Sequence, residues 1–350
     1  MSPFLYKLYV NNLLADLKQN SLGLKIGTTY VGCPTCIDDI ALLGSSQEEL
    51  QCMLSVALNR ANRDRVTIHP SKTKAVILNK RNTITRSNLH WELGDKTVCP
   101  SEETTQLAII RIELKENQLI VEARMSLARR TLYSLIINTG VYDSNRLIPK
   151  VSFKIYQCYV LPRLLYGLEI LPLSKTHLDI LNKFHMKTLR NFQSLPSRTA
   201  KGATFPLIGA LPLEAEIHRR QLSFLHNILA CNNTTIQDLA ELVLIDIDNP
   251  LSFFCITSQL LHQYELPDIN TLAKNQPKKI SWKHTVREAV RKHWLKILPE
   301  DIENKSTLVN LQKDLLKFGS THQVWDSLQS TVSDVKKGII KARLLTGAYM

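Results

Sequence analysis

The spacing of apolar residues changes near residue 115, and this change most limits the folds open to the chain. Before it, short apolar runs alternate with helical stripes, which predicts helices over 4–17 and 46–61, a hairpin over 35–43, and strands over 65–69 and 74–78. After it, helical periodicity dominates. This order predicts an α+β, predominantly helical protein in which helices cover one face of a small sheet.

The helical part contains four long segments, 121–140, 152–171, 176–195 and 211–230. Proline has no backbone N–H, so Pro162 predicts a kink in the second segment. The most apolar stretch, 160–173, contains Arg163 and Glu169 and is too short for a membrane span, so it is interpreted as a buried helix. Other prolines are expected to make 203–214 a turn region and to separate shorter helices at Pro250, Pro267, Pro277 and Pro299.

Positive charge is concentrated in the middle of the chain. The 350 residues include 44 Lys and Arg against 31 Asp and Glu, a net charge of +13, with a pI near 9.4. Residues 121–220 hold 15 of these basic residues and 6 of the acidic ones, a net charge of +9. A surplus of positive charge of this kind favours polyanionic binding partners, and nucleic acid is the first candidate. The alternative is a set of solvated helix faces on which acidic residues are scarce.

The cysteine pattern favours reduced thiols. Seven cysteines, an odd number at low density in a long chain, indicate an intracellular protein, although they do not distinguish nucleus from cytoplasm. Cys33 and Cys36 form a C-x-x-C pair, but no second pair or H-x-x-x-H follows for zinc. The pair also precedes a predicted strand, whereas a thioredoxin-like motif opens a helix. Redox or metal use of this pair is therefore not favoured.

Two adjacent acids, Asp38 and Asp39, lie at the centre of the predicted hairpin. Their carboxylates repel each other, and a divalent cation relieves that repulsion. Mg²⁺ is usually held by one or two carboxylates together with substrate phosphates, and paired metal ions serve phosphoryl transfer. The alternative is an ordinary turn, because aspartate side chains readily bond the nearby backbone. Just beyond the hairpin, Ser46 and Glu49 are expected to form a capping box.

Several sequence segments before and after the aspartate pair form an ordered series that helps to interpret the pair. In chain order they are MSPFLYKLYVNNLL, GTTYVGCPTCIDDIALLGSS, RVTIHPSKTKAVIL, HWELGDKTV with TTQLAIIR, LPRLLYGLEIL and ALPLEAEIHRRQLSFL. The ordered series resembles the reverse transcriptase of a non-LTR retrotransposon over nearly the whole chain. The resemblance implies a partial reverse-transcriptase palm, with its catalytic hairpin, strands and covering helices, over 1–115. An all-α thumb over 116–235 and a C-terminal helical region over 236–350 are expected to follow.

The activity that this resemblance implies is RNA-directed DNA polymerisation by metal-dependent nucleotidyl transfer. Asp38 and Asp39 match the family's ligands for Mg²⁺, or for Mn²⁺, and Lys72 matches a lysine near the leaving pyrophosphate. The expected partners are an RNA template, a DNA primer and nucleotide triphosphates, without a membrane. Residues of the thumb-like region match those that hold template and primer: Arg129, Arg130, Lys183, Lys187 and Arg190.

The chain also departs from the family pattern. The family places fingers, a strand with the third metal-binding aspartate and a Gln-Gly pair upstream of the segment that begins here at Met1, so we expect this chain alone to be inactive. Cys36 stands where tyrosine is usual, and Ala108 stands where glycine is usual. The alternative is a non-catalytic, nucleic-acid-binding helical module derived from a retroelement. A helical scaffold that has lost both roles is a third hypothesis, and Lys72 has the alternative of a surface lysine beside a turn.

Overall fold

The computed structural model describes residues 3–78, 89–137, 147–245, 249–303, 305–312, 316–329 and 331–348. Helices predominate and the strands form short antiparallel hairpins, which confirms the predicted mainly helical α+β class. No helix in these ranges has the length and apolar content needed to cross a bilayer. All seven cysteines are free thiols, as predicted.

The chain forms two compact units. The first unit comprises Met1–Ile120 together with Asn232–Ile245, and the second comprises Val121–Cys231 together with Asp246–Met350. The palm, thumb and C-terminal division at 1–115, 116–235 and 236–350 stays a prediction.

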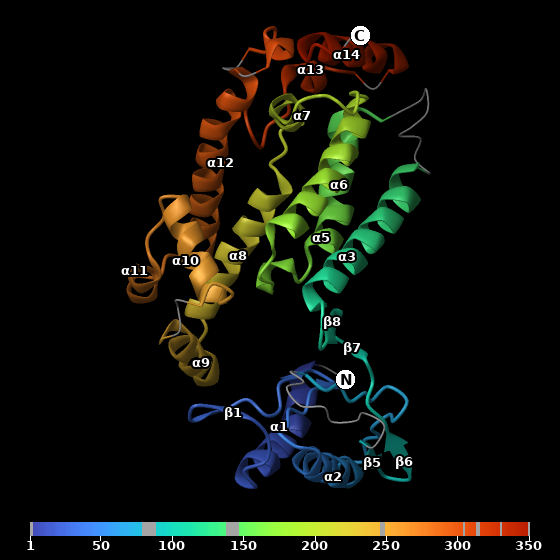
Figure 1. Cartoon of the computed structure of the whole chain (residues 1–350), viewed down its shortest axis with the longest axis vertical. Coiled ribbons are helices and arrows are strands. Elements are labelled where there is room, and N and C mark those ends of the chain that lie inside the picture. The colour runs from blue at the N-terminus through green and yellow to red at the C-terminus, as the bar shows by residue number, and fades with distance from the viewer. Residues whose placement is uncertain are drawn as a thin grey trace. The chain divides into compact units, whose positions relative to one another are not determined.

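Two helices build the core of the first unit. The predicted amphipathic stripes fold as α1 (Pro3–Gln19) and α2 (Gln47–Arg63), and their buried Leu13, Leu17 and Met53 share one apolar cluster. The guanidinium of Arg60 on α2 donates to the carboxylate of Asp16 on α1 from Nε at 2.9 Å. Apolar burial and one ion pair therefore join these two helices, both of which Figure 1 labels.

The start of α2 differs in part from the predicted capping box. The Ser46 hydroxyl accepts from the Glu49 backbone N–H at 3.1 Å, as expected of an N-cap. The Glu49 carboxylate, however, accepts from the backbone N–H of Gly23 at 2.8 Å and from the backbone N–H and hydroxyl of Ser45 at 2.7 and 2.6 Å. These hydrogen bonds lower the pKa of Glu49. The helix start is thus linked to residue 23, which is distant in sequence.

The strands form four separate antiparallel pairs within the described part of the chain. The pairs are β1 (Lys25–Ile26) with β2 (Thr29–Tyr30), β3 (Thr35–Cys36) with β4 (Asp39–Ile40), β5 (Trp91–Leu93) with β6 (Lys96–Val98), and β7 (Glu103–Gln106) with β8 (Ile109–Ile112). The prediction of one sheet covered by helices is therefore wrong for these residues.

The predicted strands over 65–69 and 74–78 are also wrong. The described structure has no strand there, and Ala75 makes only an isolated parallel bridge with Pro100. Their β-branched residues fit a strand locally, but a strand also needs a continuous partner for its backbone N–H and C=O groups. No such partner lies beside these segments in the described structure.

The β7–β8 hairpin carries backbone strain. Its two-residue loop places Leu107 at φ 49° and Ala108 at φ 60°, the left-handed pair that a type I′ turn requires. Residues with a Cβ atom disfavour the left-handed backbone conformation, whereas glycine adopts it readily. Ala108 is also the residue that replaces a usual glycine in the family that the sequence resembles.

Replacing Ala108 with glycine is expected to stabilise the first unit by about 0.5–1 kcal/mol. Glycine relieves the strain of the left-handed backbone in the folded state, and this gain exceeds the stabilisation of the unfolded chain by the greater conformational entropy of glycine. Amide hydrogen exchange of β7 and β8 measures the change. Ala61→Gly, in the helical backbone of α2, is the matched control and should destabilise by about 1 kcal/mol. Equal effects of the two substitutions would contradict the assigned strain.

The second unit is a helical assembly (Figure 1). Helix α3 (Glu116–Leu132) begins in the first unit and continues into the second from Val121. The first part of the second unit then contains a π-helical turn η2 (Tyr133–Ile137), α4 (Pro149–Ile155), a π-helical turn η3 (Tyr156–Val160), α5 (Leu161–Leu165), a 3₁₀ turn η4 (Leu168–Ile170), α6 (Lys175–Gln193), α7 (Lys201–Ile208) and α8 (Leu213–Leu229). Its later part contains α10 (Phe253–Gln263), α11 (Ile269–Lys274), α12 (Lys279–Glu303), η5 (Ser306–Leu308), α13 (Gln323–Asp326) and α14 (Val332–Leu345). The intervening α9 (Thr234–Ile245) belongs to the first unit.

The helical hydrogen-bond pattern changes just before Pro162, and a kink there stays a prediction. α4 passes into the π-helical turn η3 directly before α5, and Pro162 has no N–H for the carbonyl four residues earlier. Tyr156, Val160 and Leu164 on this segment are buried. The most apolar stretch of the sequence is therefore a buried helical element, as expected.

Two predictions based on proline are wrong. Residues 201–208, expected within a turn region, form α7 with Pro206 inside it, and α12 continues through Pro299. A proline inside a helix costs about 3 kcal/mol. Burial of Phe205, Leu207 and Ile208 contributes about 1.5–3 kcal/mol for each side chain and outweighs that cost in α7.

Candidate nucleic-acid interface

The aspartate pair lies at a strand-to-strand turn, which confirms the predicted hairpin. Thr35 pairs with Ile40 and Cys36 pairs with Asp39, so that Ile37 and Asp38 form the two-residue turn. Asp38 and Asp39 are both exposed. Ile37 adopts φ 59°, a strained value for a β-branched residue.

The two carboxylates have the oxygen chemistry that Mg²⁺ prefers, but they do not make a resident metal site by themselves. Within the described residues, no group of three or more His, Cys, Asp or Glu side chains is placed to hold a metal ion. Six ligands at near-octahedral positions are needed, and two exposed carboxylates supply few of them. Binding of Mg²⁺ or Mn²⁺ therefore stays a prediction, and no chemical step is derived through it.

Lys72 lies at a turn of the first unit. Its backbone N–H donates to the carbonyl of His69 at 3.1 Å, and its side chain is exposed. In the described part of the chain, no hydrogen bond or ion pair joins the Lys72 side chain to the hairpin. Its role near a leaving pyrophosphate stays a prediction.

The predicted thumb cations come together along α3 and α6. The Arg129 guanidinium on α3 lies 6.0 Å from the ring centroid of Phe184 on α6. Lys183 and Lys187 flank Phe184 and, four residues apart, share one face of α6. Both lysines are exposed, as are Arg129 and Arg130. None of these four cations forms an ion pair within the described structure.

A further arginine extends this basic surface on the other side of α3. Arg163 of α5 donates from Nη1 to the hydroxyl of Thr131 on α3 at 2.8 Å. Nearer the start of α3, the guanidinium of Arg124 lies 4.8 Å from the ring centroid of Tyr166. Helix α3 thus has contacts to α5 and to α6. The "α3 face" denotes the exposed cations of these three helices: Arg129, Arg130, Arg163, Lys183 and Lys187.

Arg190 lies in a different environment from the other predicted cations. Its guanidinium donates to the backbone carbonyl of Thr199 and is partly buried, and this burial lowers its pKa. Arg190 therefore connects the end of α6 to the loop before α7. The structure brings four of the five predicted thumb cations into a common exposed setting and places the fifth in a backbone contact.

Sequence analysis missed a second row of cations on α12. Lys279, Lys283 and Arg287 follow one another at four-residue steps and are exposed, whereas Trp282 and Val286 face the core. The signal was present as K-x3-K-x3-R, but residues 221–350 hold 15 basic and 13 acidic residues, and a net charge of only +2 hid the row. Counting charges by helical spacing in every segment would have found this row.

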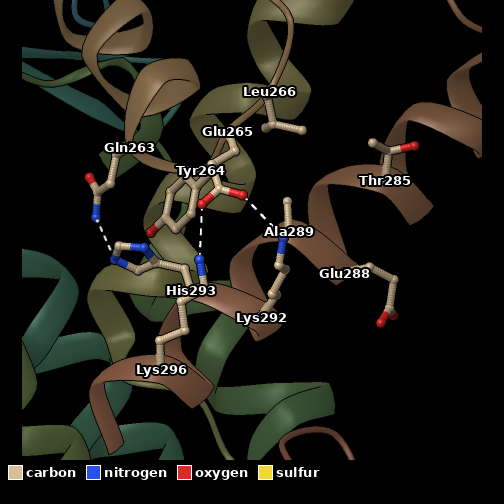
Figure 2. A pocket seen from close by; sticks show the side chains of 10 residues that line it. All are labelled: Gln263, Tyr264, Glu265, Leu266, Thr285, Glu288, Ala289, Lys292, His293 and Lys296. Carbon is tan, nitrogen blue, oxygen red and sulfur yellow. Dashed lines mark hydrogen bonds and ion pairs between the residues drawn. The ribbon is translucent and has the colours of Figure 1, made fainter.

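A pocket of about 440 Å³ lies between the end of α10 and the middle of α12 (Figure 2). The Glu265 carboxylate bridges two lysines there, with Oε1 2.9 Å from Lys296 Nζ and Oε2 3.1 Å from Lys292 Nζ. These hydrogen bonds, from Lys296 first and then from Lys292, lower the pKa of Glu265 to about 2. The Glu265 carboxylate offsets one of the two lysine charges and would itself repel an anion in this pocket.

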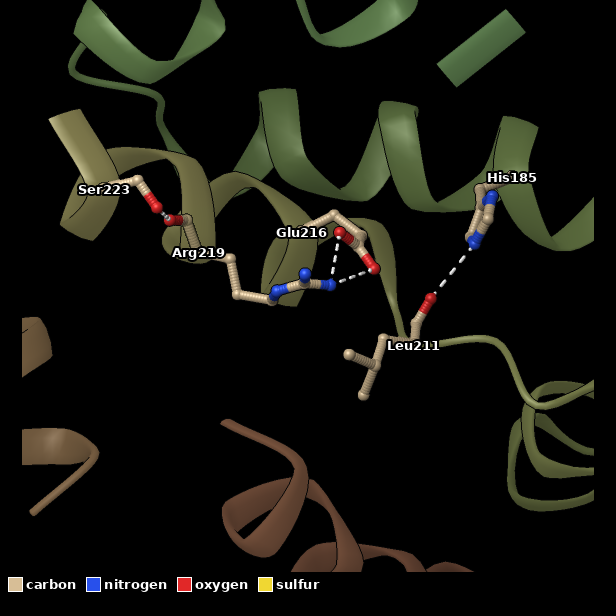
Figure 3. A network of polar contacts seen from close by, with 5 residues as sticks. All are labelled: His185, Leu211, Glu216, Arg219 and Ser223. Carbon is tan, nitrogen blue, oxygen red and sulfur yellow. Dashed lines mark hydrogen bonds and ion pairs between the residues drawn. The ribbon is translucent and has the colours of Figure 1, made fainter. Parts of the chain in front are cut away.

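Buried polar groups hold the helices behind the α3 face. His185 on α6 donates from Nε2 to the carbonyl of Leu211 at 3.1 Å (Figure 3). Its Nδ1 lies 2.9 Å from the Tyr156 hydroxyl and must accept from it, because the ring is neutral. Burial lowers the pKa of His185 to about 4. The two hydrogen bonds fix the tautomer of the ring and join α6 to η3 and to the start of α8.

No protein-family profile matches this chain, and no curated protein is significantly similar to it.

Proposed function

We propose that this chain is part of a non-LTR retroelement reverse transcriptase and that its second unit binds nucleic acid through the α3 face. The observation that carries binding is the set of exposed cations along α3, α5 and α6 that lack acidic partners within the described structure. Phosphates are neutralised by summed positive charge, so grouped cations without acidic partners suit a phosphodiester backbone.

The ancestry rests on the aspartate pair at a two-residue hairpin, followed by the resembling segments in family order. In the proposed complete enzyme, the primer 3′-hydroxyl oxygen would form a bond to the α-phosphorus of a nucleoside triphosphate, and pyrophosphate would leave as its bond to that phosphorus breaks. Asp38 and Asp39 would hold the divalent cations that stabilise the charge of this reaction. We propose that this chain does not carry out that reaction by itself, because two exposed carboxylates fix too little of the metal geometry. Robust primer extension by the chain with Mg²⁺ or Mn²⁺ would overturn this part of the proposal.

Removing three charges from the α3 face tests the binding function. The triple variant Arg129→Gln, Lys183→Gln and Lys187→Gln is expected to weaken binding of a 20-nucleotide RNA by about 10- to 100-fold at roughly 0.1 M salt. In a plot of the logarithm of the association constant against the logarithm of the salt concentration, the loss of three phosphate contacts should also reduce the magnitude of the slope by about 2. Fluorescence anisotropy over a salt series measures both quantities.

The row on α12 supplies a charge-matched control. Lys279→Gln, Lys283→Gln and Arg287→Gln remove the same charge from another helix of the same unit. An equal loss of RNA affinity in the two triple variants would show that attraction depends only on the net charge of the unit. That result would contradict binding at the α3 face. Affinity of the native chain that does not change with salt would reject nucleic-acid binding by phosphate neutralisation. Asp38→Ala should leave affinity unchanged, since the hairpin lies in the first unit.

A further inference from the structure

Three tyrosines stand exposed beside the α3 face. Tyr133 of η2 is 57% exposed, Tyr159 of η3 is 55% exposed, and Tyr166 at the end of α5 is 45% exposed. Large aromatic side chains carry extensive apolar surface, so three exposed rings around one helix need an explanation. Arg124 contacts the Tyr166 ring within the fold, whereas the rings of Tyr133 and Tyr159 are more than half exposed.

Each of the three tyrosines lies close in sequence to an exposed arginine. Tyr159, Arg163 and Tyr166 are separated by four and three residues, and all three are exposed while Val160, Leu161 and Leu164 are buried. The contact of Arg163 with Thr131 places this row beside α3. On α3 and its π-helical extension, Arg129 and Arg130 precede Tyr133 by four and three residues. Each tyrosine therefore has an arginine within one helical turn.

Alternating cations and aromatic rings suit single-stranded nucleic acid. In such sites the cations follow the phosphates, and the exposed bases of an unpaired strand stack on aromatic rings. A duplex offers the same phosphates but keeps its bases stacked on one another. A surface that binds only duplex gains nothing from the tyrosines, whereas a strand with free bases can use them.

We propose that the α3 face binds single-stranded nucleic acid and that Tyr133, Tyr159 and Tyr166 receive its bases. This inference rests on the proposed nucleic-acid binding and adds the form of the ligand. Arg124 lies over the Tyr166 ring at 4.8 Å, which orients that ring without burying it. Because base stacking depends little on base identity, the site should be tolerant of sequence.

An abasic strand separates base stacking from phosphate attraction. The probes are a 20-nucleotide oligoadenylate and a 20-unit abasic strand with the same phosphodiester backbone. The native chain should bind oligoadenylate at least about fivefold more tightly than the abasic strand. The double variant Tyr133→Leu and Tyr159→Leu should lose this difference, and Tyr133→Phe with Tyr159→Phe should retain it. These side chains are exposed, so the substitutions spare the core.

The outcomes distinguish the two levels of the proposal. Equal affinity of the native chain for both strands, with normal salt dependence, overturns stacking and leaves phosphate binding in place. Unchanged preference in the leucine variant also overturns the role of the tyrosines. Failure of the native chain to bind either strand rejects both the tyrosine site and the binding function. Tighter binding of a 20-base-pair duplex than of oligoadenylate overturns the single-strand assignment.

Discussion

Acidification from pH 7 to pH 4.5 is expected to destabilise the second unit through its buried histidines. Burial lowers the pKa of His185 to about 4, and burial with the nearby His293 lowers the pKa of His218 to about 4. In the unfolded chain both regain a pKa near 6.5. Between these values the unfolded chain binds more protons than the folded one, so the free energy of unfolding falls as pH falls.

The size of this effect follows from the width of the pH window. Each histidine is expected to remove about 2 kcal/mol from the free energy of unfolding by pH 4.5. The contacts agree with a neutral ring, since His185 lies between the Tyr156 hydroxyl and the Leu211 carbonyl. His218 Nδ1 lies 2.7 Å from the Tyr264 hydroxyl, and burial raises the pKa of Tyr264, which keeps that phenol protonated.

Urea unfolding at pH 7, 5.5 and 4.5 measures the loss. The free energy of unfolding of the His185→Gln variant should depend less steeply on pH than that of the native chain, because residue 185 no longer takes up a proton on unfolding. The exposed His284 provides a control, and His284→Gln should keep the native dependence. An identical slope in the His185 variant would assign the acid sensitivity to other groups.

Substitution of Trp325 by alanine is expected to cost the second unit about 4 kcal/mol. Trp325 on α13 is completely buried, and loss of a buried tryptophan side chain typically costs 3–5 kcal/mol through lost contacts and the remaining cavity. Its indole N–H also donates to Gln193 Oε1 on α6 at 3.0 Å. Gln193 in turn donates to the Thr204 carbonyl of α7 at 2.9 Å. One side chain thus joins three helices.

A second substitution separates packing from the hydrogen bond. Trp325→Phe keeps most of the apolar contact but leaves Gln193 Oε1 without its donor, for a cost of about 1–3 kcal/mol. Chemical denaturation measures both variants. Amide exchange should show the loss in α6 and α7 while α1 and α2, which belong to the first unit, keep their protection. Equal costs for the two variants would mean that packing of Trp325 contributes little.

The elements that sequence predicted best are those defined by neighbouring residues. The amphipathic stripes of α1, α2, α6 and α8 and the hairpin around Asp38 depend on spacings of two to four residues. Elements that need a distant partner were predicted poorly. The segments 65–69 and 74–78 have strand composition without a paired strand in the described structure, and α7 contains a proline that local rules exclude.

The candidate site shows the same division. The family resemblance pointed to Arg129, Arg130, Lys183 and Lys187, which the structure shows exposed, and their contact with nucleic acid stays a prediction. The sequence did not distinguish Arg190, whose guanidinium contacts the Thr199 carbonyl. It also did not find Tyr159 and Tyr166, which lie in a stretch interpreted as buried. Exposure of one face of a largely buried helix depends on which neighbours cover the other faces.

The sequence by itself determined the mainly helical class, the turn at the aspartate pair and the concentration of positive charge in residues 121–220. These properties follow from composition and short-range spacing. Only the tertiary structure decided that Glu49 bonds to Gly23, that Arg163 bonds to Thr131 of α3 and that Arg129 lies over Phe184 of α6. The physical reason is that hydrogen-bond partners and solvent exposure depend on packing between segments, which residues close in sequence do not fix.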